Sequence, residues 1–336
     1  MNRCSRTSNK STGDRSMNKR NFIKALGAAL ALPSGMAWSQ ASRGGATRVV
    51  VPLPAGSSND YVTRVLLPLV GAANGQNYFI DNKPGGNGTI ATLDVVRAAP
   101  NGATLLCGSN SPLAANVAFF KNLGYDPRKD LTPIAAVSLT NHVLMVKASS
   151  PIRTFADFIA HAKANPGKVS VGYSTTSVQT QIATMNRLAG IDLLPIPYKG
   201  SPATITDVIG GTLDATLTDQ GNAQAQAKAG QLRPLAVSSL KRNPVMPDWP
   251  AISETLAGFD FPSWNALMGP AGMPRELVTR VSDAVIKVQK SRDLIDKYAT
   301  QGATPLSMGP DELKAFIDSE TTRWVQLARA ANIQPE

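Results

Sequence analysis

Short apolar stretches alternate with amphipathic ones along most of the chain. Arg48 to Pro52 is a β-branched run bounded by proline, which predicts a buried strand, and an amphipathic helix is expected over 60–70. Beyond these, the pattern predicts strands at 78–81, 104–108, 169–173, 194–198, 213–218 and 235–238, and helices at 89–98, 154–164, 178–189, 201–210 and 224–229. This alternation, which starts afresh near residue 169, predicts two similar α/β units, each built on a parallel sheet with helices on both faces.

Further segments indicate how the two units are joined. His142 to Lys147 is an apolar strand that predicts a crossover between the units. Two long amphipathic helices, near Glu276–Lys290 and Asp311–Ala331, lack a sheet of their own, so we expect them to pack on the first unit. The predicted domains are a first lobe of 44–142 and 242–336 and a second lobe of 143–241, with a two-strand hinge near 140–150 and 235–245.

The first 39 residues differ from the rest in charge and hydropathy. Lys19, Arg20 and Lys24 precede or open an apolar run, Ala25 to Met36, whose length of about 12 residues suits a signal peptide rather than a membrane-spanning helix. Small residues permit cleavage before Gln40 or two residues later. We therefore expect 1–39 to be a signal peptide that is cleaved on export to the periplasm, by a route that the sequence leaves open.

The expected leader changes what the net charge implies. The chain has a formal net charge of +11, and residues 1–39, with seven Lys or Arg and one Asp, carry +6 of it. The remaining +5 suits small anionic ligands, and no cluster of Lys and Arg with interleaved aromatic residues argues for nucleic acid. Cys107 is the only cysteine beyond the leader, so neither an internal disulfide nor a thiolate metal site is expected.

Two polar loops occupy corresponding positions in the two units. Pro54 to Asn59 follows the first strand of the first unit, Ser174 to Ser177 follows the first strand of the second, and each loop leads into a helix. Ligands of open α/β sheets bind beyond the carboxyl ends of the strands, where helix N-termini offer free N–H groups and partial positive charge. One such loop alone is more typical of helix capping. Two opposed loops predict a site that holds an anion without cationic side chains.

Signatures of enzymes are weak in this chain. Neither of its two histidines, His142 and His161, lies near a serine or cysteine nucleophile motif, and Gly-x-Ser-x-Gly is absent. Gly86 to Ala91 matches G-x-G-x-x-A, but it is better read as the turn that starts a helix. Asp60 and Asp219 each follow a strand, and capping and loop bracing account for them better than acid–base work. We therefore expect no catalytic residue, no cofactor and no metal ligand.

Several short motifs occur in a fixed order over nearly all of the chain beyond the leader. They are Val51 to Gly56 with Asp60 and Arg64, Asp81 to Ile90, Tyr125 to Pro127 with Asp130, Pro133 and Ile134, Pro197 to Gly200 with Pro202 and Ala203, Leu235 to Val237, Trp264 with Gly269 to Gly272, and Arg323 with Trp324. Each motif is weak alone, but their order and spacing are specific. On these residues the chain resembles the Bug-type extracytoplasmic solute receptors of the tripartite tricarboxylate transporter family.

This resemblance implies a type II periplasmic-binding-protein fold, in which two doubly wound α/β lobes joined by a two-strand hinge close on a ligand. The family's ligands are small mono- or dicarboxylates, or aromatic or amino-acid relatives. Carried over residue by residue, the resemblance assigns ligand binding to Gly56, Ser57, Ser58, Asn59, Asp60, Ser174, Thr175, Thr176, Ser177, Gln179 and Asp219.

Three departures from the family pattern bear on the ligand more than on the fold. Ser57 follows Gly56 where the family commonly has a second glycine, the second loop is shorter and lacks the usual glycines, and Gln179 stands where a histidine is common. Tyr61 and Tyr173 flank the two loops, which is compatible with an aromatic carboxylate. Packing at a lobe edge is the better account of both tyrosines.

One function and two alternatives follow. We expect a monomeric periplasmic receptor, not an enzyme, that captures a small carboxylate by hinge closure and delivers it to the membrane permease subunits of a tripartite tricarboxylate-type transporter. A ligand sensor that acts with a signalling partner is the first alternative. An exported enzyme that uses Asp60 and Asp219 is the second.

Overall fold

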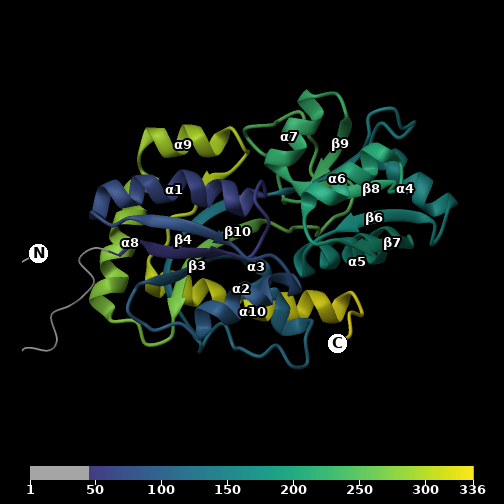
Figure 1. Ribbon diagram of the computed structural model, residues 1–336. Helices are drawn as coiled ribbons and strands as arrows, with labels where there is room; N and C mark the ends of the chain where they lie inside the picture. Colours follow the sequence, from purple (N-terminus) through teal and green to yellow (C-terminus); the bar gives the residue numbers. More distant parts are fainter. Residues whose placement is uncertain (1–44, 336) are drawn as a thin grey trace, which may run out of the picture. The chain divides into compact units, whose positions relative to one another are not determined.

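The computed structural model describes residues 45–335, in which helices surround two β-sheets (Figure 1). The predicted signal peptide, residues 1–39, lies outside the described residues and stays a prediction. Most of the predicted strands and helices are present within a few residues of their expected bounds. The mixed α/β architecture agrees with the predicted fold class.

The first sheet has six strands in the order β11-β4-β10-β3-β1-β2. Strands β1, β2 and β3 are parallel to one another, whereas β10 runs antiparallel to both β3 and β4. The bounds are β1 (Thr47–Val51), β2 (Tyr78–Asn82), β3 (Thr104–Ser109), β4 (Leu131–Thr140), β10 (Ser263–Pro270) and β11 (Thr304–Pro305).

The second sheet has five strands in the order β7-β6-β8-β5-β9. Strand β6 is parallel to β7 and β8, whereas β5 is antiparallel to β8 and β9. The bounds are β5 (His142–Lys147), β6 (Val169–Tyr173), β7 (Leu193–Pro197), β8 (Ala215–Asp219) and β9 (Leu232–Val237).

Both sheets are therefore mixed, which corrects the prediction of parallel sheets. Only Asn141 separates β4 from β5, so β5 enters the second sheet from the edge at which the parallel strands end. It must run opposite to them, because a parallel strand needs a long crossover connection. The return strand β10 enters the first sheet in the same way. Strands β4 and β10 are absent from the predicted elements, since β10 is buried along its whole length and shows no alternation.

Helices cover both faces of the two sheets. Their bounds are α1 (Ser58–Asn74), α2 (Thr89–Val96), α3 (Asn110–Leu113), α4 (Phe155–Ala164), α5 (Thr176–Ala189), α6 (Ser201–Gly210), α7 (Gln220–Lys228), α8 (Arg275–Gln289), α9 (Arg292–Ala299) and α10 (Pro310–Ala330), with 3₁₀ turns η1 (Gly86–Gly88), η2 (Ala115–Ala118) and η3 (Ile252–Glu254). As predicted, α8 and α10 pack against elements of the first sheet.

Alternate residues of the central strands pack into hydrophobic clusters on opposite faces of each sheet. Val49 and Val51 of β1 join the cluster that α1 and α8 cover, whereas Val50 joins the cluster that includes residues of α2 and α10. In the second sheet, Val143 of β5 faces α6 and α7, and its neighbour Leu144 faces the opposite way. This two-residue period is what a strand buried on both faces requires. This packing on both faces holds the carboxyl ends of β1 and β6, and the helices that follow them, in fixed positions.

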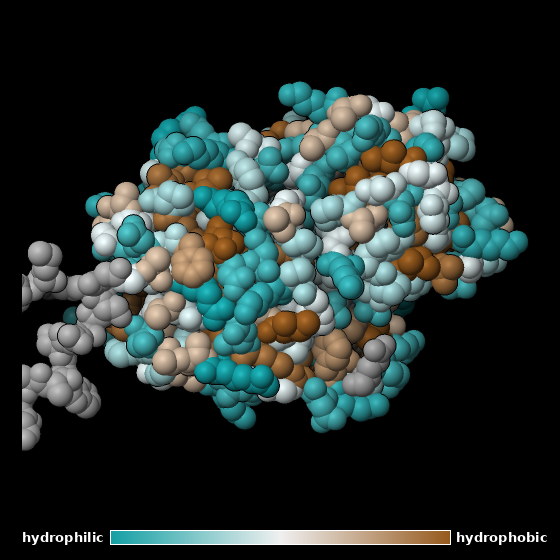
Figure 2. Space-filling view, viewed as in Figure 1, coloured by the Kyte–Doolittle hydropathy of each residue, from teal (hydrophilic) through white to brown (hydrophobic). Residues whose placement is uncertain are grey.

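The surface is largely polar. Figure 2 shows hydrophilic side chains over most of the visible face, with apolar ones interspersed. None of the helices in the described part of the chain combines the length and apolar character needed to cross a membrane.

Candidate ligand-binding site

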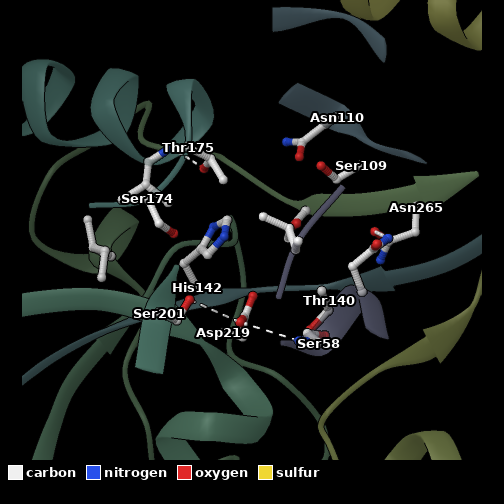
Figure 3. Close-up of a pocket in the computed structure, with 15 residues that line it drawn as sticks. Ser58, Ser109, Asn110, Thr140, His142, Ser174, Thr175, Ser201, Asp219 and Asn265 are labelled. Atoms are coloured by element: carbon white, nitrogen blue, oxygen red, sulfur yellow. Dashed lines mark hydrogen bonds between the residues drawn. The ribbon is translucent and has the colours of Figure 1, made fainter. Parts of the chain in front are cut away.

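A cavity lies where the carboxyl ends of strands from both sheets meet (Figure 3). Its volume is about 20 Å³, little more than one water molecule needs. Most of the lining is hydroxyl and amide groups. The lining residues are Leu53, Ser58, Asn59, Ser109, Asn110, Thr140, His142, Ser174, Thr175, Val178, Ser201, Leu217, Asp219, Ser263 and Asn265.

The start of α1 supplies the first group of lining residues. Ser57 caps this helix, because its Oγ accepts a hydrogen bond from the backbone N–H of Asp60 at 3.3 Å. The first helical turn then places Ser58 and Asn59 on the cavity. Gly56 has φ of +82°, a left-handed conformation that favours glycine and turns the chain into the cap.

Asp60 braces this loop from behind. Its Oδ2 accepts hydrogen bonds from Gly56 N–H at 3.0 Å and Arg64 Nε at 2.9 Å, and its Oδ1 accepts one from Asn82 Nδ2 at 3.0 Å. Burial raises the pKa of the Asp60 carboxyl, but the donated hydrogen bonds outweigh burial, so its pKa is lowered. Asp60 is therefore a carboxylate committed to the loop, and it does not line the cavity.

The start of α5 supplies the opposing group. Thr175 caps α5 by accepting a hydrogen bond from Val178 N–H at 3.3 Å, and both Ser174 and Thr175 line the cavity. Thr176 and Ser177 instead contact residues that follow β3 and α3. Thr176 Oγ1 donates to Asn116 Oδ1 at 2.8 Å.

Ser177 carries two further bonds to residues of the first unit. Its Oγ accepts a hydrogen bond from Asn110 Nδ2 at 3.1 Å, and its backbone N–H donates to Ser111 Oγ at 3.2 Å. Together with the bond from Thr176, these contacts join the start of α5 to the segment after β3. We call the Thr176 and Ser177 contacts the α5 bridge.

Asp219, the last residue of β8 in the second sheet, contacts the start of α1, which follows a strand of the first sheet. Its Oδ2 accepts hydrogen bonds from the backbone N–H of Ser58 at 3.4 Å, Ser201 Oγ at 3.2 Å and Asn222 Nδ2 at 3.3 Å. The carboxylate thus lies at the N-terminus of α1, where N–H groups and the helix dipole favour negative charge.

His142 lies directly across from Asp219 in the antiparallel pair of β5 and β8. Its Nδ1 lies 3.0 Å from Gln181 Nε2, an amide group that donates. Burial lowers the pKa of His142, and the charge of Asp219 opposes this effect without cancelling it.

Three polar atoms of the lining are buried and have no hydrogen-bond partner. They are Ser58 Oγ, Asn59 Oδ1 and Thr140 Oγ1. Buried polar atoms in proteins nearly always have partners, so each unpartnered atom calls for an explanation. Their concentration around one cavity indicates a place for a polar occupant.

The structure brings together only some of the residues that the sequence assigns to ligand binding. Ser58, Asn59, Ser174, Thr175 and Asp219 line one cavity. The others do not line it: Gly56, Ser57 and Asp60 shape and brace the first loop, Thr176 and Ser177 form the α5 bridge, and Gln179 is half-buried one turn into α5. Contact between any of these residues and a ligand stays a prediction.

Sequence reasoning assigned five of the fifteen lining residues and missed the other ten. Ser109 and Asn110 directly follow the strand predicted at 104–108 and could have been found by the rule used for the two loops. Ser263 and Asn265 open β10, and His142 opens β5. Because these two strands run antiparallel to their neighbours, their first residues lie at the edge where parallel strands end. A polar residue in an apolar run, such as Asn265, was the only signal.

Within residues 45–335, no group of three or more His, Cys, Asp or Glu side chains is arranged to hold a metal ion. His142 contacts an amide rather than a carboxylate, and no serine of the lining hydrogen-bonds to it in this part of the chain. The arrangement therefore offers hydrogen bonds to a bound molecule.

Comparison with known proteins finds relatives along almost the whole chain. A UPF0065 protein of Bordetella bronchiseptica is 33% identical over 313 residues, which cover 91% of each chain. Protein BugT of Bordetella pertussis is 29% identical over 286 residues, which cover 84% of this chain and 88% of BugT.

Solved structures show the same fold. R. palustris Rpa4515, solved with adipate, has a TM-score of 0.85 and 28% identity, and the match covers 88% of this chain and all of that one. The periplasmic binding protein BugD has a TM-score of 0.82 and 26% identity over 86% of this chain and 98% of BugD. MatC from Rhodopseudomonas palustris, solved with bound malate, has a TM-score of 0.79 and 27% identity over 84% of this chain and 98% of MatC.

The match to a described protein family is equally extensive. Residues 62–333 match the Tripartite tricarboxylate transporter family receptor. This stretch includes most of α1, both sheets beyond β1, and the helices that follow. The chain therefore belongs to the tripartite tricarboxylate transporter receptor family and is a Bug-type solute receptor.

Proposed function

We propose that this receptor captures a small carboxylate in the periplasm, leaves it chemically unchanged, and delivers it to the permease subunits of a tripartite tricarboxylate-type transporter. The observation that carries the proposal is the cavity with its three unpartnered buried atoms, Ser58 Oγ, Asn59 Oδ1 and Thr140 Oγ1. A polar ligand would supply the hydrogen bonds that these atoms lack.

The chemistry of the lining suits an oxyanion that needs no cationic partner. The N-termini of α1 and α5 meet at the cavity, where their positive dipole ends favour an anion. Most of their first backbone N–H groups already donate to protein acceptors, so the hydroxyl side chains beside them would supply the donors. Two structural neighbours were solved with carboxylates, adipate in Rpa4515 and malate in MatC. These neighbours support a carboxylate for this chain as well.

Binding without turnover accords with the hydrogen bonds that already engage Asp60 and His142. Both oxygens of Asp60 are engaged in bracing the first loop, and His142 Nδ1 is paired with Gln181. An enzyme that used Asp60 and Asp219 as a carboxylate pair would need Asp60 to reach the cavity. Asp60 is absent from its lining.

Hinge closure is the mechanism we propose. Residues 44–142 and 242–336 would form one lobe and 143–241 the other, and the chain passes between the sheets at Asn141 and again between β9 and β10. The cavity is too small for a dicarboxylate as it stands, so the ligand would bind to an open form and be enclosed as the lobes close.

A ligand screen tests the receptor function. The chain without residues 1–39 is mixed with mono-, di- and aromatic carboxylates, and the midpoint of thermal unfolding (Tm) is followed. A true ligand should raise Tm in a saturable way, with roughly 2.7 kcal/mol of added stability at a hundredfold excess over Kd. NMR of the same mixture should show the ligand unchanged after hours. Turnover of a carboxylate, or no ligand at all, would contradict the proposal.

A paired substitution places the binding at the cavity. Ser174 lines the cavity and makes no hydrogen bond among the described residues, so Ser174→Tyr should fill the space and abolish the Tm increase. Ser307 is exposed and likewise without a hydrogen bond in that part of the chain, so Ser307→Tyr should bind normally. Equal binding by both variants would mean that the ligand lies elsewhere.

Delivery to a permease needs its own measurement. Uptake of the identified ligand by cells should require both the receptor and the permease subunits. Uptake that is unchanged when the receptor is deleted would favour a sensor over a transport receptor.

A further inference from the structure

The charges that face the cavity are unequal. Asp219 is the one carboxylate among the lining residues, and neither lysine nor arginine contributes to the lining within the described part of the chain. His142 is the other titratable side chain of the lining, and it is neutral because burial lowers its pKa. The cavity therefore carries a net negative charge before any ligand enters.

One oxygen of Asp219 is engaged and the other is free. The hydrogen bonds from Ser58, Ser201 and Asn222 all converge on Oδ2. No described residue donates to Oδ1, and Figure 3 shows this oxygen directed into the space below the His142 ring. Asp219 is only 8% exposed, so Oδ1 is an acceptor that faces a nearly enclosed space.

The charge of Asp219 favours one kind of carboxylate ligand over another. It would bring a second negative charge beside Asp219, with no cation to compensate, and buried like charges repel strongly. The hydroxyl and amide donors can hold one anion, as in Ser109, Asn110 and Thr175. They cannot pair with the unoccupied acceptor on Asp219, which suits a donor and preferably a positive one.

We infer that the ligand is a carboxylate that also carries an ammonium group, and that Asp219 Oδ1 is the subsite for this ammonium. The ligand's carboxylate would lie on the hydroxyl and amide donors of the same cavity. This inference rests on the proposed function and narrows its substrate class to amino carboxylates.

The test compares ligands that differ in one group. Calorimetry measures Kd for three sets built on a common skeleton: succinate, malate and aspartate; propionate, lactate and alanine; 3-phenylpropionate, phenyllactate and phenylalanine. Where the screen finds another carboxylate, its own amino derivative is added. On the skeleton that fits, the amino member should bind roughly tenfold or more tightly than the unsubstituted one, with the hydroxy member between them.

Substitution of Asp219 then assigns the preference to this carboxylate. Asp219→Asn keeps the size of the side chain and removes its charge, so it should cancel most of the advantage of the amino ligand and leave the unsubstituted ligand bound as tightly or more tightly. Asp283→Asn is the matched control, because Asp283 is exposed on α8 and has no hydrogen bond or ion pair in the described residues. This control should keep the wild-type order of affinities.

The outcomes separate the two proposals. If the unsubstituted or hydroxy acid binds wild-type protein as tightly as the amino acid, the ammonium subsite is wrong while the receptor function stands. If no carboxylate of any kind binds, the proposed function itself fails. Should Asp219→Asn not fold, as judged by circular dichroism, the order of affinities on wild-type protein decides alone.

Discussion

Adjacent residues of the first loop have different roles. Ser57 caps α1 and Asp60 braces the loop, while Ser58 and Asn59 between them face the cavity. A loop motif in a sequence therefore marks where a site is, without showing which of its residues face a ligand. Those roles depend on the direction of each side chain in the first helical turn, which sequence spacing alone leaves undetermined.

The buried His142 makes stability depend on pH. Its pKa in the folded chain is below the value of about 6.5 that the unfolded chain should show. Between the two pKa values the unfolded state binds more protons, so stability falls as pH drops below about 6.5, by up to about 1.4 kcal/mol per pH unit. Stability that this residue contributes above that pH is lost on acidification.

Replacement of this histidine should flatten the acid side of the stability profile. In His142→Gln, Tm should fall less between pH 7 and pH 5 than in the wild type, because a group that resists protonation has been removed. His161→Gln is the control, since His161 is exposed, and it should keep the wild-type slope. Identical slopes in all three proteins would show that His142 does not stay neutral in the folded state.

At the scale of elements, the start of α5 holds the two halves of the site together. Thr176 is fully buried and its hydroxyl donates to Asn116 Oδ1 at 2.8 Å. The bond can form only when the two sides are in contact. Its loss should leave a buried acceptor unsatisfied in the closed form alone, which shifts the population toward the open form.

Thr176→Val should therefore make the free energy of closure less favourable by about 1–2 kcal/mol. Ligand binding should weaken by roughly 5- to 30-fold as a result. Thr180→Val provides the comparison, because Thr180 lies one turn further along α5, is equally buried, and donates to Thr176 O within its own helix. That variant should lose some stability and keep its affinity. Calorimetry that finds the same loss of affinity in both would remove the α5 bridge from the account of closure.

Elements differ in how far the sequence predicts them. Strands such as Thr47–Val51 and the helices after them follow from hydrophobic period and caps, and their existence is confirmed. The direction of β5 and the presence of β10 depend on how the chain passes between two sheets, a tertiary feature without a local signal. Because His142, Ser263 and Asn265 sit on those two strands, this part of the candidate site could not be predicted from pattern alone.

At the scale of the whole molecule, hinge closure requires two conformations of different compactness. Small-angle X-ray scattering should show a smaller radius of gyration when the ligand identified in the screen is present at saturation. Ser174→Tyr, which should not bind, should show no ligand-dependent change. A radius that stays the same for wild-type protein with bound ligand would mean that binding proceeds without hinge closure.

The central claim is that hydrogen-bond donors from both sheets enclose one carboxylate. A crystal structure of the chain with the ligand from the screen, or with the molecule that co-purifies with it, tests this directly. We predict density for a carboxylate within the cavity, in hydrogen-bond contact with residues at the start of α1 or the end of β3 and with Ser174 or Thr175 before α5. A ligand held by residues of one sheet only, or bound outside this cavity, would contradict the account.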